Sequence, residues 1–417
     1  MAEDLPTQRY QSKSQMEKRY LLGTLTLGHT VIHWYQQMFP VILPLIRADL
    51  GLTYVQVSGL MTAKQAASGL LTLPSGFAAD AFNKHKAVIL GSALAMGGLA
   101  YFLASIAPTY FWVLVFLVML GAASALWHPS SVSTLSLQFS NRRGTALALH
   151  GVGASIGDSV GPICVGALLV LVGWRDLAQW HLIPALVLAL LMWKTVHKNY
   201  STGTSTLSRR SYFAGIKGIL VRPTIFMVML ASSFVGMARL SVTTFLPLYL
   251  AEEMGYSSFW LGFHWALLYA MGMFSQPLMG ILSDKFSRKT VLLPSFATLG
   301  LLYLALPMPG PGISLALIIS AMGLFFYGTG NIATAAVLDV AADQVQGTTQ
   351  SFMSLFQQVV TLPAPLIAGW IVTQFGYTVV FYYASGLLFS AATVWLLIHI
   401  PNRTGALGTG GGFGRTR

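Results

Sequence analysis

Charged side chains interrupt long apolar stretches of this sequence. Lys64, Asp158 and Arg239 each lie inside such a stretch. A charged side chain at the centre of a bilayer costs about 2.5–3.5 kcal/mol, so each one should face a polar cavity or a partner. Side chains of this kind could bind a polar solute or carry a proton across a membrane. A buried ion pair between Asp158 and Arg239 is the alternative.

Polar residues recur at helical spacing around these charges, because residues three, four and seven apart share a helix face. Three of the stripes are Lys64 with Ser68, Arg239 with Thr243, and Gln357 with Thr361. The residues expected to bind substrate are His29, His33, Gln36, Lys64, His128, Arg239, His264, Asn331 and Gln357. We expect them to line a central aqueous cavity. For the neutral ones, hydrogen bonding between helices is the alternative.

The composition indicates a membrane protein. The 417 residues are 55% hydrophobic and 9% charged, with a mean hydropathy of +0.66. The net charge of +12 comes from basic residues in short segments between apolar runs, which favours a role in helix orientation over nucleic-acid binding. A single cysteine, Cys164, excludes an intrachain disulfide. The polar beginning of the chain predicts no cleaved signal peptide.

Twelve apolar runs are long enough to span a bilayer, for which about 17–25 residues are needed. They lie near 20–46, 55–79, 87–107, 110–136, 145–172, 177–196, 223–250, 259–282, 290–307, 313–338, 348–374 and 377–400. The expected organisation is a cytoplasmic tail (1–19), a six-helix bundle (20–193), a cytoplasmic linker (194–222), a second bundle (223–401) and a disordered tail (402–417). Lysine and arginine fall in alternate connections, which predicts that both termini are cytoplasmic.

The two halves repeat one another at an offset of 203 residues. The offset superimposes Pro44 on Pro247, Pro74 on Pro277, Pro162 on Pro365, and Gly166 on Gly369. Parallel repeats of this kind are typical of transporters whose halves rock about a site between them. The predicted fold is therefore an all-α membrane protein with twelve spanning helices in two pseudo-symmetric bundles.

Two equivalent loops give this duplication a family resemblance. Residues 74–86 read PSGFAADAFNKHK and residues 277–289 read PLMGILSDKFSRK. Both resemble the loop signature of the major facilitator superfamily, although Ser287 replaces the later glycine, and Ala81 and Asn83 depart from the pattern in the first copy. The resemblance implies a gate on the cytoplasmic side. The gating residues that it implies are Gly76, Asp80, Lys84, Gly280, Asp284, Arg288 and Lys289.

The fifth apolar run carries glycines four apart, which let a neighbouring helix approach closely. Gly157, Gly161 and Pro162 are expected to bend this helix. The pattern resembles the glycine–proline signature of drug:proton antiporters in the superfamily, although Ala148 and Val165 stand where that signature has glycine. The resemblance favours antiport over uptake.

A second resemblance narrows the group. Trp127-His128-Pro129, Arg143-Gly144 and the run HGVGASIGDSVGP at 150–162 look like the fosmidomycin-resistance group of bacterial exporters. An acidic residue commonly follows His-Pro in that group, whereas Ser130 does here. Proton coupling would therefore fall to His128 itself or to Asp158. The resemblance implies residence in a bacterial inner membrane.

The sequence thus predicts a secondary transporter, not an enzyme, that exchanges a small anionic or zwitterionic solute for protons by alternating access. No cofactor or metal site is expected, since the proton gradient supplies the energy and no nucleotide-binding loop is present. The expected partners are the solute, protons and membrane lipid, with no nucleic acid, and the protein is expected to be a monomer. The alternatives are a proton-coupled importer of organic anions, a metal-ion transporter and a non-transporting receptor.

Overall fold

The computed structural model describes residues 5–81, 85–196, 223–340 and 346–398. Within these ranges every regular element is a helix. The predicted linker from residue 197 on and the predicted C-terminal tail lie outside them. The first helix already begins at Leu5, so most of the stretch expected as a polar tail continues the first span.

The helices form two sets that pack mainly among themselves. The N-terminal bundle contains α1 (Leu5–Leu50), α2 (Tyr54–Ala81), α3 (Lys86–Ser105), α4 (Tyr110–Gln138), α5 (Arg143–Leu168), α6 (Trp174–Trp180) and α7 (Leu182–Val196). The C-terminal bundle contains α9 (Pro223–Leu248), α10 (Ser258–Phe286), α11 (Arg288–Ala305), α12 (Ile313–Phe326), α13 (Gly328–Val340), α14 (Gln346–Thr361), α15 (Ala364–Phe375) and α16 (Tyr377–Leu397). A π-helical turn at Tyr249–Glu253 extends α9.

The helices make the twelve predicted spans, three of which are broken into two pieces. The pieces are α6 with α7, α12 with α13, and α14 with α15. The last break lies at Leu362 and Pro363, where proline cannot supply a helical N–H group. In the described parts of the chain, nine segments are long and apolar enough to cross a membrane by composition alone. The other three spans are α1, α2 and α11, and the first two carry much of the polar lining described below.

Glycines bring α1 and α5 into close contact. A Cβ atom on Gly153 would lie 2.4 Å from the carbonyl oxygen of Thr26, and one on Gly157 would lie 2.3 Å from that of Thr30. Only glycine allows this approach without a shift of the backbone. The predicted close packing is thus present, and it sets Asp158 against the polar face of α1. The predicted bend of α5 at Pro162 stays a prediction.

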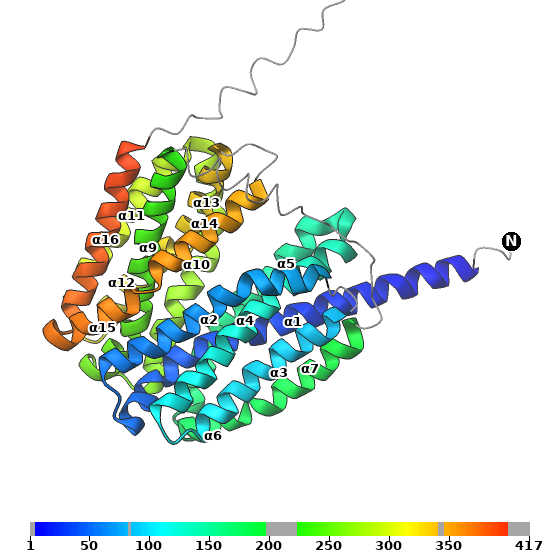
Figure 1. Ribbon diagram of the computed structural model, residues 1–417, viewed down its shortest axis with the longest axis horizontal. Helices are drawn as coiled ribbons and strands as arrows, with labels where there is room; N and C mark the ends of the chain where they lie inside the picture. The colour runs from blue at the N-terminus through cyan, green and yellow to red at the C-terminus, as the bar shows by residue number, and fades with distance from the viewer. Residues whose placement is uncertain (1–4, 82–84, 197–222, 341–345, 399–417) are drawn as a thin grey trace, which may run out of the picture.

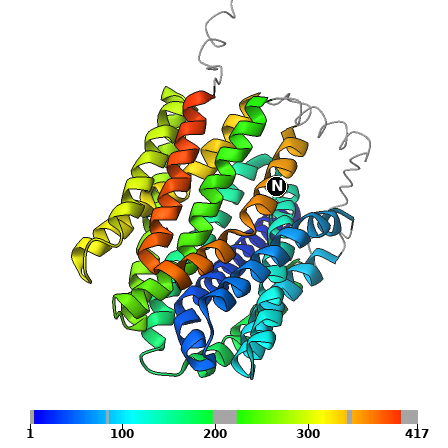
Figure 2. The same cartoon turned by 60° about the vertical axis from the view of Figure 1, so that its left-hand side comes forward.

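The bundles contact each other along two equivalent pairs of helices, α5 with α10 and α2 with α15 (Figures 1 and 2). Gly166 lies against the Ser258 carbonyl of α10, and Gly369, its counterpart in the repeat, lies against Ser58 of α2. From these contacts the bundles diverge toward the end where α7 ends and α9 begins (Figure 1). We call this the open end and the opposite one the sealed end.

Polar bonds join the bundles at the sealed end. Arg47 Nη1 lies 2.7 Å from Glu252 Oε1, and the Arg47 guanidinium stacks 4.2 Å from the Tyr54 ring centre. The hydroxyls of Tyr54 and Tyr377 donate to the other carboxylate oxygen of Glu252, at 3.0 and 2.7 Å. One carboxylate from the C-terminal bundle therefore binds two groups of the N-terminal bundle.

Candidate functional site

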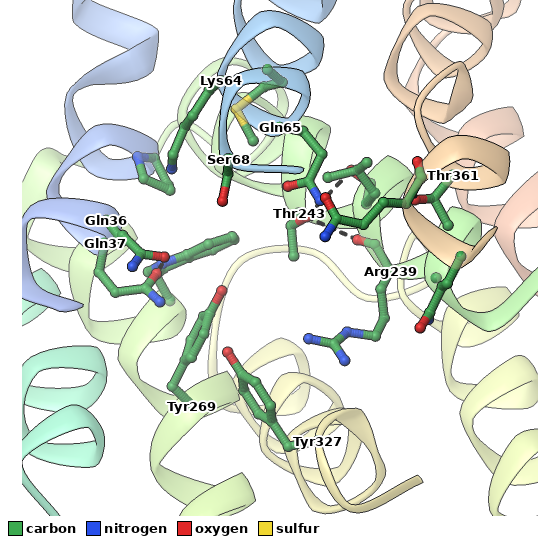
Figure 3. A pocket seen from close by; sticks show the side chains of 17 residues that line it. Gln36, Gln37, Lys64, Gln65, Ser68, Arg239, Thr243, Tyr269, Tyr327 and Thr361 are labelled. Carbon is green, nitrogen blue, oxygen red and sulfur yellow. Dashed lines mark hydrogen bonds between the residues drawn. The ribbon is translucent and has the colours of Figure 1, made fainter. Parts of the chain in front are cut away.

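A cavity of about 420 Å³ lies between the two bundles (Figure 3). Helices α1 and α2 line one side, and α9, α10, α14 and Tyr327 line the other. The lining side chains are Gln36, Gln37, Pro40, Met61, Lys64, Gln65, Ser68, Gly236, Arg239, Leu240, Thr243, Trp265, Tyr269, Tyr327, Gln357, Gln358 and Thr361. This is the central polar cavity that the stripes predict. Of the residues expected to bind substrate, it brings together Gln36, Lys64, Arg239 and Gln357.

Two cations face this cavity without a carboxylate partner among the described residues. The Arg239 guanidinium stacks on the rings of Phe326 and Tyr327, 4.6 and 4.8 Å from their centres. The Lys64 ammonium lies 5.7 Å from the Phe39 ring centre. The ion pairs formed within the described residues involve other groups, so the alternative pairing of Arg239 with Asp158 is not present. The cavity therefore holds positive charge available to a ligand.

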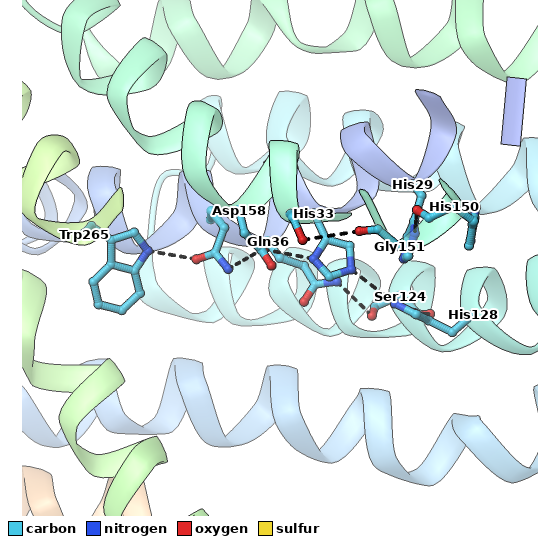
Figure 4. A network of polar contacts seen from close by, with 11 residues as sticks. His29, His33, Gln36, Ser124, His128, His150, Gly151, Asp158 and Trp265 are labelled. Carbon is cyan, nitrogen blue, oxygen red and sulfur yellow. Dashed lines mark hydrogen bonds and ion pairs between the residues drawn. The ribbon is translucent and has the colours of Figure 1, made fainter. Parts of the chain in front are cut away.

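Asp158 lies on α5 beside the cavity, where it accepts two hydrogen bonds from α1 (Figure 4). His33 Nδ1 is 2.9 Å and Gln37 Nε2 is 2.7 Å from the same oxygen, Oδ1. The Asp158 side chain is 14% exposed and that of His33 is 19% exposed. Asp158 is therefore a partly buried carboxylate whose two donors suit its ionised form.

Four histidines continue the network away from the cavity inside the N-terminal bundle (Figure 4). His128 Nδ1 lies 2.8 Å from the Ser124 carbonyl, and its Nε2 lies 3.4 Å from His33 Nε2. His29 Nδ1 lies 2.9 Å from the carbonyl of His150, and the two rings stack with centres 4.0 Å apart. The predicted binding residues His29, His33 and His128 thus form a cluster behind the cavity.

Hydrogen-bond partners indicate which ring nitrogens of this cluster carry a hydrogen. Ser124 offers a carbonyl, which only accepts, so the Nδ1 atom of His128 carries its hydrogen. The Nδ1 atom of His33 faces a carboxylate and carries its hydrogen for the same reason. The two Nε2 atoms then point lone pairs at each other, and one added proton removes this repulsion. One ring nitrogen each from His29, His33 and His128 lies within 4.8 Å of the others, a spacing that metal sites also use.

Two predicted binding residues lie elsewhere. His264 stacks on Tyr256 with ring centres 4.5 Å apart and contacts the Trp260 carbonyl through Nδ1, without lining the cavity. Asn331 donates to Gln276 at 3.2 Å and is exposed. Their roles in substrate binding stay predictions.

The predicted gating residues that lie within the described parts of the chain are at the open end. Arg288 pairs with Asp284 and also donates to the Ser283 hydroxyl at 2.7 Å. Lys289 donates to the carbonyls of Leu396 and Ile398, at 2.7 and 3.0 Å, at the end of α16. Gly76 and Gly280 have open space beside them. Lys84 and the side chain of Asp80 lie outside the described residues, and the latch between the halves stays a prediction.

Sequence reasoning missed the residues that join the cavity to Asp158. Gln37 lies four residues after His33, on the same helix face, but was not among the predicted residues, and Trp265 is an apolar residue within an apolar run. Trp265 and Tyr269 are four apart on α10, the spacing of one helix face, which could have signalled a shared aromatic wall.

Comparison with known proteins agrees with this architecture. The sequence model of one family matches residues 25–363 and 275–413. The chain belongs to the Major Facilitator Superfamily. Within the superfamily, it is 26% identical over 298 residues to the fosmidomycin resistance protein of Escherichia coli K12, covering 69% of this chain and 70% of that one.

Two further members of the superfamily cover nearly the whole chain. A probable sulfoacetate transporter of Cupriavidus necator is 24% identical over 414 residues, covering 93% of this chain and 95% of that one. The crystal structure of a bacterial homolog of the human lysosomal transporter Spinster, inward-facing and occupied, superimposes with a TM-score of 0.73 at 17% identity, covering 91% and 96% of the chains. The chain is thus an integral membrane protein with the major facilitator fold.

Proposed function

We propose that this protein is a secondary transporter that exports a small organic anion in exchange for protons. The observation that carries the proposal is the cavity between the bundles, which presents Arg239 and Lys64 to a ligand with no carboxylate paired to either among the described residues. Unpaired charge inside a membrane is expensive, so its retention is expected where a ligand supplies the opposite charge.

The lining also indicates what else the substrate should offer. Glutamine, serine, threonine and tyrosine side chains surround the two cations and can bind hydroxyl, carbonyl or further anionic oxygens. Arg239 presents a planar guanidinium, which suits the paired oxygens of a carboxylate, sulfonate or phosphonate. The names of two relatives, one for fosmidomycin resistance and one for sulfoacetate, are consistent with substrates of this type.

The proton half of the exchange would use Asp158 and His128. Asp158 binds His33 at 2.9 Å, and His33 faces His128 at 3.4 Å, so one proton can be held at the carboxylate or between the rings. Because these groups lie within a few side chains of the cavity, their charge can affect the anion bound there.

Alternating access would follow from the two-bundle architecture. With both termini cytoplasmic, as the basic connections predict, the open end faces the cytoplasm and the sealed end faces outward. The structure would then correspond to the state that takes up substrate from inside. We propose a bacterial inner membrane as its location and a monomer as its working form.

Two alternatives would use the same features differently. An importer of organic anions would move anion and proton together through the same cavity. A receptor or scaffold would not need free cations between mobile bundles. The experiment below separates all three.

The test is transport by the purified chain in proteoliposomes with a pH-sensitive dye inside. The panel is fosmidomycin, sulfoacetate and the lipophilic cation tetraphenylphosphonium. We expect at least one of the two anions to cross, with protons moving in the opposite direction, and Arg239→Gln to weaken both signals strongly at the same anion concentration. Arg142→Gln makes the same chemical change at an exposed position outside the cavity and is the control.

Four results would contradict the proposal. Movement of an anion and protons in the same direction would favour the importer. Anion movement without a pH change would contradict the proposed coupling to protons. Transport of the lipophilic cation alone would contradict the proposed specificity for anions. No transport of any of the three compounds by the wild-type chain would contradict the proposal that it is a transporter of such anions.

A further inference from the structure

One hydrogen bond at the cavity joins the two bundles, and the amide that accepts it also binds Asp158. The Trp265 indole on α10 donates through Nε1 to Gln37 Oε1 on α1, at 2.8 Å. The same amide donates through Nε2 to Asp158 Oδ1, at 2.7 Å. Trp265 is 1% exposed and Gln37 is 6% exposed, and both line the cavity. The Gln37 amide therefore contacts Trp265 of the C-terminal bundle and the Asp158 carboxylate of its own bundle at the same time.

The chemistry of the three groups fixes the direction of both bonds. An indole N–H can only donate, so the amide oxygen of Gln37 must face Trp265. The amide nitrogen, with its two donors, must then face Asp158. An ionised carboxylate accepts from it with a charge-assisted bond, which is about twice as strong as a neutral one. The Gln37–Trp265 link is thus best formed when Asp158 carries its negative charge.

We propose that the Gln37–Trp265 link holds the empty carrier in the arrangement seen here, and that either exchanged ligand releases it. This inference rests on the proposed anion–proton exchange. It assigns positioning roles to Gln37 and Trp265, which act through Asp158 and through the substrate.

A proton releases the link from the Asp158 side. Protonation removes the charge that holds the Gln37 amide, and a protonated carboxyl gains an O–H donor that can bind the oxygen of a turned amide. The amide must then weaken its bond or turn over, and in the turned orientation it no longer offers oxygen to Trp265. Other titratable groups within electrostatic reach of Asp158 are His33 on α1, His128 on α4, Tyr269 on α10 and Tyr327. The charge of Arg239, also at the cavity, interacts with the same two tyrosines.

A bound anion releases the link from the Trp265 side. The indole lines the same cavity as Arg239 and Lys64, so an anion held there can offer its oxygen to the Trp265 N–H group. An anionic oxygen is a stronger acceptor than a neutral amide oxygen. The indole can therefore leave Gln37 for the substrate.

This arrangement supplies what an exchanger needs. An exchanger must reorient with proton or substrate bound and must not reorient empty, since empty reorientation would allow net leakage of either ligand. A link that is intact only with Asp158 ionised and the cavity vacant meets this requirement. It lies between α1 and α10, close to the α5–α10 contact about which the bundles would move.

The test measures the separation of the bundles without any transport. Spin labels are attached at Asn141→Cys and Phe286→Cys, both exposed at the open end, in a Cys164→Ala background. Double electron–electron resonance then gives the distance between the two labels. For the empty wild-type chain we expect the open arrangement to dominate at about pH 8 and its ratio to the closed one to fall about tenfold at about pH 5, the factor expected for one hydrogen bond to a charged group. Sulfoacetate or fosmidomycin at the higher pH should act in the same direction.

Trp265→Phe removes the donor and keeps an aromatic ring. We expect this variant to show the shifted ratio already at the higher pH, with little further response to pH. Gln37→Leu should do the same and provides a second route to the answer where one variant folds poorly. Trp395→Phe is the matched control, because Trp395 is fully buried in the same bundle and its indole nitrogen has no partner.

The outcomes are separable from those of the transport experiment. The role of the link would be overturned if the ratio of open to closed arrangements in Trp265→Phe and Gln37→Leu changed with pH as much as it does in the wild-type chain and in Trp395→Phe. Failure of the wild-type chain to move protons would overturn the proposed exchange. The distance measurement on the empty protein would still decide whether the link holds the bundles.

Discussion

The two bundles share a scaffold but differ in the chemistry that they turn toward the cavity. Gln36 on α1 and Arg239 on α9 occupy equivalent positions in the repeat, and both line the cavity. Asp158 on α5 is equivalent to Thr361 on α14. The N-terminal bundle therefore holds the carboxylate and the histidines, while the C-terminal bundle contributes the arginine.

The contacts between the bundles have kept their symmetry. Gly166 against Ser258 and Gly369 against Ser58 are equivalent close approaches on opposite sides of the cavity. A bulkier residue at either position would push the bundles apart. The comparison teaches that the duplication is kept in the contacts between the bundles, whereas residues at equivalent positions, such as Asp158 beside the cavity and Thr361 in its lining, differ in chemistry and in placement.

The largest effect is expected from making the two bundles chemically alike. Arg239→Gln places the residue type of the N-terminal bundle at the equivalent position. It removes a charged donor from a site that stays polar, so we expect the apparent affinity for the transported anion to fall about 10- to 100-fold. Concentration-dependent uptake in proteoliposomes measures it. If Arg239→Gln bound the anion as tightly as Arg142→Gln does, the arginine that distinguishes the C-terminal bundle would not serve anion binding.

A smaller effect is expected at Lys64, which supplies the second cation from the N-terminal bundle. An ammonium makes less directional bonds than a guanidinium, so Lys64→Gln should weaken anion uptake roughly tenfold. Lys64→Arg should restore much of it, because the charge returns. A loss in Lys64→Arg as large as in Lys64→Gln would indicate that shape at this position matters more than charge.

The smallest effect is expected at the sealed end, where the bundles meet through Glu252. Glu252→Gln removes the ion pair with Arg47 but leaves an oxygen for the tyrosine hydroxyls. A partly exposed pair contributes about 0.2–1 kcal/mol, so the ratio of open to closed arrangements at the open end should fall by a factor of about 1.4 to 5.

Asp49→Asn is the matched control for this change. It removes an ion pair with Arg175, at 2.8 Å, that lies within one bundle at the same end. The spin-label distances should not change in this variant. Equal shifts in both variants would show that the Glu252 pair does not control the arrangement of the bundles.

Much of the fold could be predicted from the sequence, because most spans are long apolar runs and the repeat relates the two halves. The breaks at His181 and Tyr327 were not predicted, since neither residue is a helix breaker, and both residues make tertiary contacts in the structure. His181, for example, accepts from the Trp34 indole at 2.9 Å across the bundle.

The part of the site formed by polar residues in apolar helices could be predicted from the sequence. Lys64, Arg239 and Gln357 stand out in apolar helices and do line the cavity. His29, His33 and His128 stand out equally, yet they face one another inside a bundle, because hydropathy alone does not tell the cavity face of a helix from its packed face. Trp265 could not be recognised from the sequence, because its proposed role depends on one N–H group of an otherwise apolar side chain.

The most direct test of the account compares two modes of transport in Asp158→Asn. The amide keeps the size of the carboxylate but cannot ionise. We expect exchange of labelled for unlabelled anion at equal pH to persist within about threefold, since the cavity cations remain, and uptake driven by a pH gradient to fall at least about tenfold. Gradient-driven uptake equal to that of the wild-type chain would contradict the role of Asp158 as the proton carrier.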